Sequence, residues 1–360
     1  MSQPEWISSV KPCLRGVGEK GRLFPNGKRV EVVFAVKAVN FLLLRTEGPG
    51  DINEATLPKS GISVPVIQPQ KIMAVVRRRM LQLLRQYRDS GADLRPFILK
   101  AKEMGFRKAE EHLTNGWECT IQPPLASGGE KATDLGIDGY CPACTIFGAA
   151  LTQNQYEEAG GTMSIGLKSR VHFDPAFATT RAIQPETHNK VSEGYASTTG
   201  GALFSDVHVM PGTVFMGRVV LHDVTLPELL AVLYSLATTE EIGGRSSIFG
   251  GIRMELLGIR CGNYSKTTAL ELAEEYAGRN VWDLEGVLKR LNELGFSKLS
   301  NEDVTRAVNP IEKDGIFKEL WQSSIDYVEQ MHGLIQSMRG EGQRGKGRRG
   351  GKRQEASEEQ

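Results

Sequence analysis

Residues 30–46 (VEVVFAVKAVNFLLLRT) constrain the fold more than any other segment of the chain. The segment is rich in β-branched and apolar residues, contains neither glycine nor proline, and ends at the turn-forming sequence EGPGD. This pattern predicts a buried strand, although the segment is too long for one flat strand. A helix is predicted at 70–88, because apolar residues recur there at three- and four-residue spacing. The chain therefore begins with a strand followed by a helix.

Four further elements complete an order typical of one architecture. They are strands at 164–173, 213–224 and 252–259 and a helix at 226–242. Thr225 and Glu228 supply a capping box at the start of that helix. The order strand, helix, strand, strand, helix, strand is the split βαβ arrangement of a ferredoxin-like or RRM-like domain. We predict an α+β fold with a palm at 1–90 and 163–262, an insertion at 91–162, a helical region at 263–339 and a disordered tail at 340–360.

The charge of the chain is almost balanced, with 44 Lys and Arg against 43 Asp and Glu. The tail at 340–360 carries six Lys or Arg and four Glu, which leaves the body slightly negative. A body this neutral has no global field that attracts nucleic acid. A polyanion would therefore have to bind in a local groove.

The cysteines and the amino terminus indicate a cytoplasmic protein. Five cysteines, an odd number, do not form a disulfide framework and leave thiols available for metal. Residues 1–11 are polar, so we expect neither a signal peptide nor a membrane anchor. In addition, no apolar run reaches the roughly 20 residues that span a bilayer.

The sequence Cys141-Pro-Ala-Cys144 is the sharpest local signal. Its two-residue gap lets both thiolates reach one tetrahedral metal, and Cys119 and His112 lie upstream in the same insertion. Four Cys and His ligands in a segment poor in apolar residues predict a structural zinc site. Two alternatives remain at this point: plain thiols, or a redox pair, which would have to open a helix in a βαβ unit.

A glycine-rich loop at 243–251 (GGRSSIFGG) joins a predicted helix to a strand. Its glycines let backbone N–H groups approach a phosphate, and Arg245, Ser246 and Ser247 add a charge and two donors. The loop follows a helix and lacks the Gly-Lys-Ser/Thr ending, so it is neither a Walker A motif nor a dinucleotide fingerprint. A helix cap followed by a bulge is the alternative interpretation.

Cations also mark the predicted strand at 164–173. Lys168, Arg170 and His172 alternate with Ser169 and Val171, so we expect the three cationic or imidazole side chains on one face. Such a face suits a polyanion groove. A solvent-facing edge strand would show the same pattern.

The predicted helix at 70–88 carries a second group of cations. Lys71, Arg78 and Arg85 lie seven residues apart and form a stripe opposite the apolar face, and Arg77 adds to the charge. By contrast, the four histidines at 172, 188, 208 and 222 are scattered, and Asp51 is isolated in the first loop. The sequence therefore specifies no catalytic constellation.

Together these motifs resemble a known family. The CPxCxxFG sequence at 141–148, the sequence MPGTVF at 210–215 and the glycine-rich loop are similar to those of the RAMP-type, Cas-seven family of CRISPR backbone subunits. The sequence IGLKSRVHFDPAFATTRAIQPETHNKVSEGYAS at 165–197 most resembles the type I-D, Csc-type subunit. The resemblance covers roughly residues 25–335.

The resemblance implies an RRM-like palm that stacks along a CRISPR RNA, with a thumb-like hairpin that reaches over the next copy. By position the thumb is the polar segment at 179–201, which has little periodicity. The implied RNA-binding residues lie on the first helix, the basic strand, the thumb and the glycine-rich loop. They are Lys71, Arg77, Arg78, Lys168, Ser169, Arg170, His172, Arg181, Arg245, Ser246 and Ser247.

The resemblance also implies partners. These are CRISPR RNA, target DNA or RNA paired with the guide, other copies of the chain, a Cas-five-like cap, a large subunit and a repeat-processing nuclease, in an antiviral complex without a membrane. Phosphates and 2′-hydroxyls would then bind the protein while base edges stay free for the target. One alternative is an endoribonuclease of the same superfamily that uses Asp51 or His172. The other is an unrelated zinc-stabilised structural protein.

Overall fold

A computed structural model describes residues 4–44, 52–121, 136–151, 157–158, 161–162, 165–189, 203–244, 248–279, 282–308 and 313–354. It shows a mixed α and β chain, as the sequence predicts. The chain divides into two compact units. Unit 1 contains residues 1–15, 26–92 and 169–317, and unit 2 contains residues 16–25, 93–168 and 318–360.

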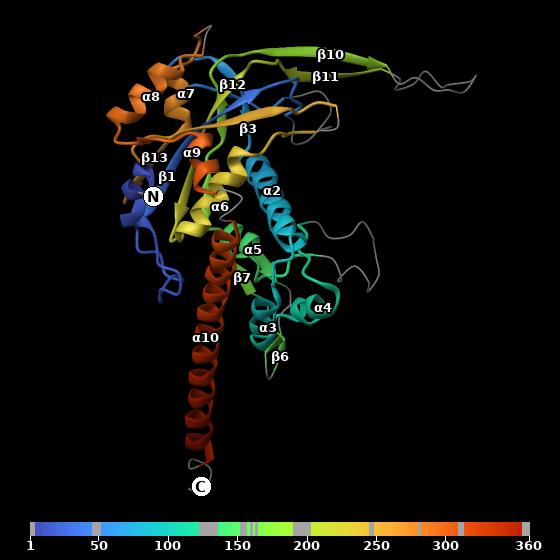
Figure 1. Ribbon diagram of the computed structural model, residues 1–360, viewed down its shortest axis with the longest axis vertical. Helices are drawn as coiled ribbons and strands as arrows, with labels where there is room; N and C mark the ends of the chain where they lie inside the picture. Colours follow the sequence, from blue (N-terminus) through green and yellow to red (C-terminus); the bar gives the residue numbers. More distant parts are fainter. Residues whose placement is uncertain are drawn as a thin grey trace, which may run out of the picture. The chain divides into compact units, whose positions relative to one another are not determined.

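Unit 1 is built on an eight-stranded sheet (Figure 1). Its strands are β1 (Arg29–Ala38), β2 (Glu54–Thr56), β3 (Ser63–Ile67), β8 (Val171–Phe173), β9 (Ala176–Ala178), β12 (Val214–His222), β13 (Ile252–Gly262) and β14 (Ser297–Lys298). The order is β14-β13-β1-β12-β9-β3-β2, and β8 also pairs with β12. β1 lies between its antiparallel neighbours β12 and β13, and eight of its ten residues are almost fully buried.

The predicted first strand is shorter than the apolar run that suggested it. β1 ends at Ala38, and the chain continues through residues 39–44 with a single bridge, from Leu42 to Val209. The predicted strand at 164–173 is also divided. β7 (Ile165–Leu167) pairs with β4 (Ala149–Leu151) in unit 2, whereas β8 pairs with β12 in unit 1. These corrections move Lys168 and Ser169 out of any regular strand.

Helices of unit 1 begin at a proline or at a capping side chain, and the helix predicted at 226–242 ends earlier than expected, at Ala237. They are α1 (Glu5–Val10), the short 3-10 helix η1 (Lys11–Cys13), α2 (Pro69–Asp89), α6 (Leu226–Ala237), α7 (Ala269–Glu275), α8 (Leu284–Glu293) and α9 (Asn301–Ala307). The predicted capping box of α6 is confirmed, because the Glu228 carboxylate accepts from the Thr225 N–H at 2.8 Å. On the described residues, no helix is both long enough and apolar enough to cross a bilayer.

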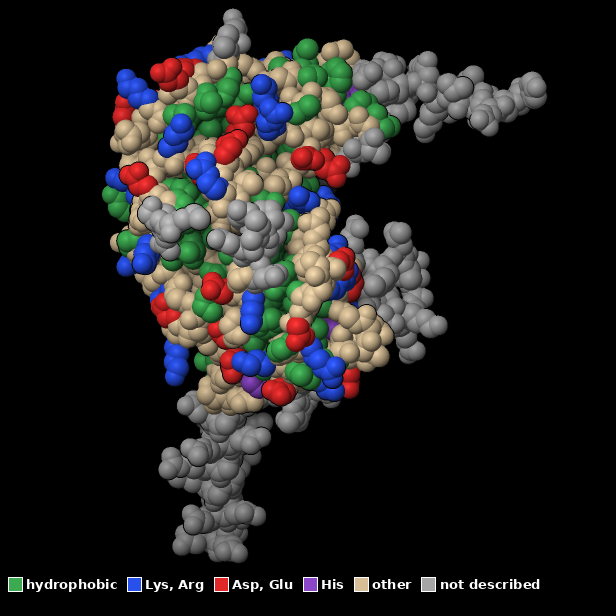
Figure 2. All heavy atoms as spheres, in the orientation of Figure 1, with side chains coloured by type: hydrophobic (Ala, Val, Ile, Leu, Met, Phe, Trp, Pro, Cys, Tyr) green, Lys and Arg blue, Asp and Glu red, His purple; other side chains and the backbone are tan. Residues whose placement is uncertain are grey.

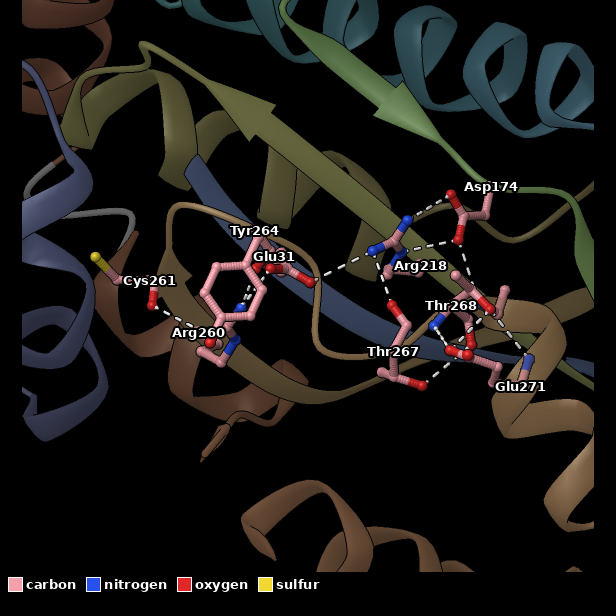
Figure 3. Close-up of polar contacts among 10 residues, drawn as sticks. Glu31, Asp174, Arg218, Arg260, Cys261, Tyr264, Thr267, Thr268 and Glu271 are labelled. Atoms are coloured by element: carbon pink, nitrogen blue, oxygen red, sulfur yellow. Dashed lines mark hydrogen bonds and ion pairs between the residues drawn. The ribbon is translucent and has the colours of Figure 1, made fainter. Parts of the chain in front are cut away.

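A buried ion network joins three central strands (Figure 3). Glu31 on β1 is fully buried and accepts from Arg260 on β13 at 2.7 Å and from Arg218 on β12 at 3.4 Å. Asp174 accepts two further bonds from Arg218, at 2.8 and 3.0 Å. Burial alone would lower the pKa of Arg218, but these carboxylates raise it above its usual value. The side chains of the network therefore remain charged and paired, and they link β1, β12 and β13.

The polar segment assigned to the thumb, residues 179–201, contains one strand, and the partner of this strand begins just after the segment. β10 (Ile183–Asn189) and β11 (Leu203–Val209) form an antiparallel hairpin in full register from Ile183 with Val209 to Asn189 with Leu203. Residues 190–202 between them lie outside the described part of the chain. In Figure 1 the hairpin extends away from the eight-stranded sheet of unit 1.

Unit 2 is mainly helical. It contains α3 (Arg95–Glu103), α4 (Arg107–Asn115), α5 (Pro142–Phe147), the short strands β4, β5 (Glu157–Glu158), β6 (Gly161–Thr162) and β7, and most of α10 (Lys313–Gln354). Trp321 on α10 is fully buried, stacks on Phe97 at 5.9 Å and meets Trp117 edge-on at 5.1 Å. α10 continues to Gln354, into the tail at 340–360 for which the sequence predicts disorder. The extension of α10 has a simple physical reason, because each residue added to a nucleated helix gains one hydrogen bond.

Cys13 and Cys261 form a disulfide across a sequence separation of 248 residues. The bond joins η1 to the end of β13, and both residues belong to unit 1. The expectation of free thiols is therefore wrong for this pair. No motif at either cysteine signals the pairing, because only the fold brings such distant residues together.

Charge on the surface is mixed in sign. Figure 2 shows Lys and Arg side chains interspersed with Asp and Glu over the face in view. This pattern agrees with the formal net charge of +1 for the whole chain. Any strong positive potential must therefore come from one element rather than from the body as a whole.

Candidate metal centre and nucleic-acid interface

Four buried side chains of unit 2 converge on one point. The ligand atoms of Cys119, Asp138, Cys141 and Cys144 all lie within 4.8 Å of one another. The Sγ atoms of Cys119 and Cys144 are 3.6 Å apart. Two thiolates on a tetrahedral zinc stand about 3.8 Å apart, given Zn–S bonds of about 2.3 Å, whereas a disulfide needs about 2.05 Å. The cluster thus has the spacing of metal ligands.

Local structure explains how the cluster forms. Cys141 directly precedes α5 and Cys144 lies in its first turn, so the two-residue gap turns both thiols to one side. The Asp138 carboxylate accepts from the backbone N–H groups of Tyr140 at 3.1 Å and Cys141 at 3.0 Å, and from the Trp117 indole at 2.7 Å. These three donors hold the carboxylate beside the thiols.

The electrostatics of the metal-free cluster favour neutral groups. Burial raises the pKa of the Cys141 thiol well above its usual range, and the neighbouring thiols Cys119 and Cys144 raise it further. Burial also raises the pKa of Asp138 to about 7. Ligands in this position lose their protons only when a cation compensates their charge. The site can therefore hold a metal, and binding would release protons.

His112 lies outside this cluster, which corrects the predicted ligand set. Its Nδ1 is hydrogen-bonded to the Tyr140 hydroxyl, and burial lowers the pKa of its ring to about 4. The imidazole therefore supports Tyr140, which precedes the first ligand of the CPAC motif. Asp138 occupies the fourth place instead. An acidic residue three positions before Cys141 was the available sequence signal.

α2 carries the largest concentration of positive charge on any one helix whose side chains are described. Its 21 residues include six Lys or Arg and a single acidic residue, Asp89. Arg78 is exposed, and Lys71 and Arg77 are half-buried. Arg79 donates from Nε to the Thr238 hydroxyl at 3.0 Å, which ties α2 to the carboxyl end of α6.

Arg170 does not share a face with Lys168 and His172, contrary to the sequence prediction. Its guanidinium is buried and forms two bonds with Glu228, at 2.9 and 2.8 Å, and one with the Asp223 carbonyl at 3.1 Å. Strand alternation fails here because β8 begins only at Val171. Arg170 thus braces the start of α6, where Glu228 also caps the helix.

The other predicted binding residues have varied surroundings. Lys168 and His172 are exposed, and the His172 ring lies 4.9 Å from that of His222. The Ser169 hydroxyl donates to the Val171 carbonyl at 2.8 Å, so it serves a local turn. Arg181 is exposed and pairs with Glu54 at 3.0 Å. Outside the described residues lie Asp51, Arg245, Ser246 and Ser247.

Three segments join at the end of β1 and form what we call the platform: residues 38–44, residues 209–213, and the described parts of the glycine-rich loop, 243–244 and 248–251. Val39 donates to the Gly251 carbonyl at 2.8 Å, and Gly212 donates to the Ala38 carbonyl at 2.8 Å. The Gly250 N–H donates to the Phe41 carbonyl at 2.8 Å. The glycine-rich loop, the thumb hairpin and the end of β1 are therefore one connected structure.

Glycine is required at two positions of the platform. Gly243 and Gly250 have φ angles of 99° and 91°, which side chains rarely adopt. A Cβ at Gly243 would lie 2.8 Å from the Leu43 carbonyl oxygen, and one at Gly250 would collide with the Ile242 carbonyl. Close backbone approach, rather than a simple helix cap, explains the paired glycines.

Comparison with known proteins decides the family. A family model described as "Csc2 Crispr" matches residues 15–349. The crystal structure of Thermofilum pendens Csc2 is 50% identical, covers 94% of this chain and 99% of its own, and superposes with a TM-score of 0.77. The chain belongs to the Csc2 family. The resemblance to the type I-D backbone subunits is thereby confirmed.

Other comparisons add little to the Csc2 assignment. One chain from a structure titled "CRISPR RNA-guided surveillance complex, pre-nicking" is 11% identical over 77% of this chain and 89% of its own, with a TM-score of 0.40. Another, from a "CRISPR RNA-guided surveillance complex", is 9% identical over 79% and 84%, with a TM-score of 0.39. These scores carry no argument. None of the curated protein sequences matches the chain.

The Csc2 match spans the functional features described above. It includes the cluster at 119–144, the cations of α2, the thumb hairpin and the platform. Sequence reasoning missed His208 on β11, which is fully buried between Phe249 at 4.8 Å and Phe41 at 6.1 Å. It joins the hairpin to the other two platform segments. No local motif marks it, because its neighbours come from distant parts of the sequence.

Proposed function

We propose that this Csc2-family chain is a non-catalytic backbone subunit that binds CRISPR RNA and oligomerises along it. The guide would remain available for pairing with target nucleic acid, in a complex with the other subunits that the family resemblance implies. The strand order β13-β1-β12, with β8 and β9 beyond β12, supports an RRM-like palm. The platform and α2 would contact the guide.

The charge of α2 is the observation that carries the proposal. Six cations and one acid on a 21-residue helix stand out in a chain with a formal net charge of +1. A neutral body with one basic element binds a polyanion locally and avoids sequence-independent adhesion elsewhere. Lys and Arg side chains on this helix would contact phosphates and would not bind base edges. This suits a protein that must accept every guide.

The thumb hairpin supplies the proposed contact between copies. β10 and β11 extend from the platform, and the resemblance implies that such a hairpin reaches over the next subunit. Its base shares the Leu42–Val209 bridge with the end of β1. A copy that grips RNA at its platform would therefore hold its hairpin in a defined direction relative to the guide.

We further propose that the metal of unit 2 is zinc with a structural role. Three thiols and a carboxylate suit zinc better than calcium or magnesium, which prefer oxygen ligands. All four ligands are buried, which describes a closed site without an open coordination position. The cluster thus stabilises unit 2 and takes no part in a reaction. We assign no catalytic role to Asp51 or His172.

Removal of α2 cations tests the proposal. Lys71→Ala and Arg78→Ala should each weaken binding to single-stranded RNA equally for unrelated sequences. The slope of log affinity against log salt should fall by about 0.7 for each phosphate that the variant no longer neutralises. Fluorescence anisotropy at several salt concentrations, with two unrelated labelled RNAs, measures both quantities.

Arg306→Ala is the matched control for these variants. Its side chain is 76% exposed on α9 and lies 3.9 Å from Asp303. It should leave affinity and salt slope unchanged. A weaker affinity confined to one RNA sequence, or unchanged slopes for both α2 variants, would contradict binding through phosphates on α2.

A further inference from the structure

One edge of β13 is only partly covered by neighbouring backbone. On its inner edge, β13 pairs with β1 from Ile252 to Gly262. On its outer edge, the described strands pair with Gly258 and Ile259 alone, through β14. A hollow of about 790 Å³ lies along the rest of the outer edge, beside α8, α9 and the end of α6, and all the residues that line it belong to unit 1. An open strand edge is a common site for the addition of another strand.

Some backbone groups of the outer edge are already bonded. The Asn301 side chain accepts from the Leu256 N–H at 2.9 Å and donates to the Met254 carbonyl at 2.7 Å. The Asn301 amide thus takes the position of one residue of a parallel neighbouring strand. The Ile252 N–H donates to the Glu240 carbonyl at 2.8 Å. Between these bonds, the Ile252 carbonyl and the Met254 N–H face the same edge beside the hollow, and neither is bonded to another described residue there.

These two free groups fit one orientation of an added strand. One residue of a parallel strand would donate to the Ile252 carbonyl and accept from the Met254 N–H. An antiparallel strand would need both backbone groups of Ile252 or both of Met254, and one group of each is already bonded. Two copies related by a two-fold axis would pair their β13 edges in antiparallel orientation. The free groups therefore favour a different segment over the β13 edge of a second copy.

The side chains around the hollow indicate the chemistry of that segment. Val39 is 59% exposed and Leu284 is 38% exposed, and both line the hollow. Five charged side chains also line it, and no ion pair of the described residues involves any of them: Glu240, Glu255, Glu302, Arg253 and Lys298. Three acids against two cations repel a polyanion such as RNA and suit a segment that carries cations.

We propose that an extended segment of another protein, with alternating cationic and apolar side chains, adds to β13 as a parallel strand in this hollow. Main-chain hydrogen bonds supply affinity in such an addition, and side-chain contacts supply specificity. The inference goes beyond the proposed function, because this partner is a protein and not RNA. Of the residues that line the hollow, only Val39 and Gly251 belong to the platform, and none belongs to α2.

A synthetic peptide tests the inference. The peptide acetyl-Lys-Val-Lys-Leu-Lys-amide should bind the full chain and shift the Met254 amide signal in protein labelled with nitrogen-15 methionine. Met254→Leu identifies that signal among the ten methionines. The same peptide with N-methyl groups on two consecutive residues should bind about tenfold more weakly. In either register one methyl group then blocks the bond to the Ile252 carbonyl.

Two acid variants test the charge of the hollow. Glu302→Gln should weaken binding of the peptide about twofold to fivefold, because it removes one exposed ion pair. Glu285→Gln is the matched control, since Glu285 is exposed on α8 and does not line the hollow. Lys71→Ala should bind the peptide as tightly as the unchanged protein does. Loss of RNA binding and loss of peptide binding are therefore distinguishable.

Several outcomes would overturn the inference. The first is no saturable binding at millimolar peptide, and the second is equal binding of the methylated and unmethylated peptides. A peptide that binds without moving the Met254 signal would occupy another site. Dimers of the chain that the peptide dissociates, measured by light scattering, would assign the edge to a second copy.

Discussion

Cys141→Ser is expected to release the metal and to unfold unit 2. Apparent zinc-binding free energies of small structural sites are about 10–16 kcal/mol, comparable to the whole stability of a typical domain, about 5–15 kcal/mol. Removal of one ligand leaves two thiols and Asp138 buried without a cation. Elemental analysis should find about one zinc per unchanged chain and almost none in the variant. The melting temperature of the variant should be more than about 10 °C below that of the unchanged protein.

His112→Asn distinguishes the observed ligand set, which includes Asp138, from the set that the sequence suggests, which includes His112. If the ligands are Cys119, Asp138, Cys141 and Cys144, this variant should keep its zinc and lose only the bond to Tyr140. Asp138→Ala should release zinc. Full zinc occupancy in Cys141→Ser, or zinc release in His112→Asn with retention in Asp138→Ala, would contradict the assigned ligands.

Reduction of the Cys13–Cys261 bond should destabilise unit 1 by about 5 kcal/mol. Closing a 248-residue loop removes much of the entropy of the unfolded chain, and loop-closure arithmetic gives a value of this size. Cys261→Ser should lower the melting temperature by about 10 °C or more in the absence of reductant. The amino-terminal helix α1 should be affected most, because η1 links it directly to the bond.

Thiol counting supplies the control for this prediction. In denaturant with a chelator, three thiols should react before reduction and all five after it. Dithiothreitol should lower the melting temperature of the unchanged protein but not that of the double variant Cys13→Ser/Cys261→Ser. Five reactive thiols without reductant would show that the bond is absent in the purified protein.

Elements with a local signature could be predicted from the sequence. The helix at 70–88 is observed as α2, because its apolar period and flanking proline act within one segment. The capping box at Thr225 and Glu228 and the convergence of the two CPAC thiols on one point follow the same logic. Each depends on residues only two to four positions apart.

Features set by tertiary contact could not be predicted. The direction of the Arg170 side chain depends on the break between β7 and β8. Its partner Glu228 is 58 residues away in the sequence. The Cys13–Cys261 bond and the packing of His208 likewise join distant residues. The thumb strands pair with each other although their sequence lacks an apolar alternation, since a hairpin can be held by backbone hydrogen bonds. Topology, not local pattern, decides such positions.

The most direct test of the central claim is the number of copies that assemble on RNA of increasing length. Single-stranded RNAs of unrelated sequence and graded length would be mixed with the full chain and measured by size-exclusion light scattering. A backbone subunit should add copies in regular steps as the RNA lengthens, with the same step for every sequence. One copy per RNA at every length, or assembly that depends on sequence, would contradict the account.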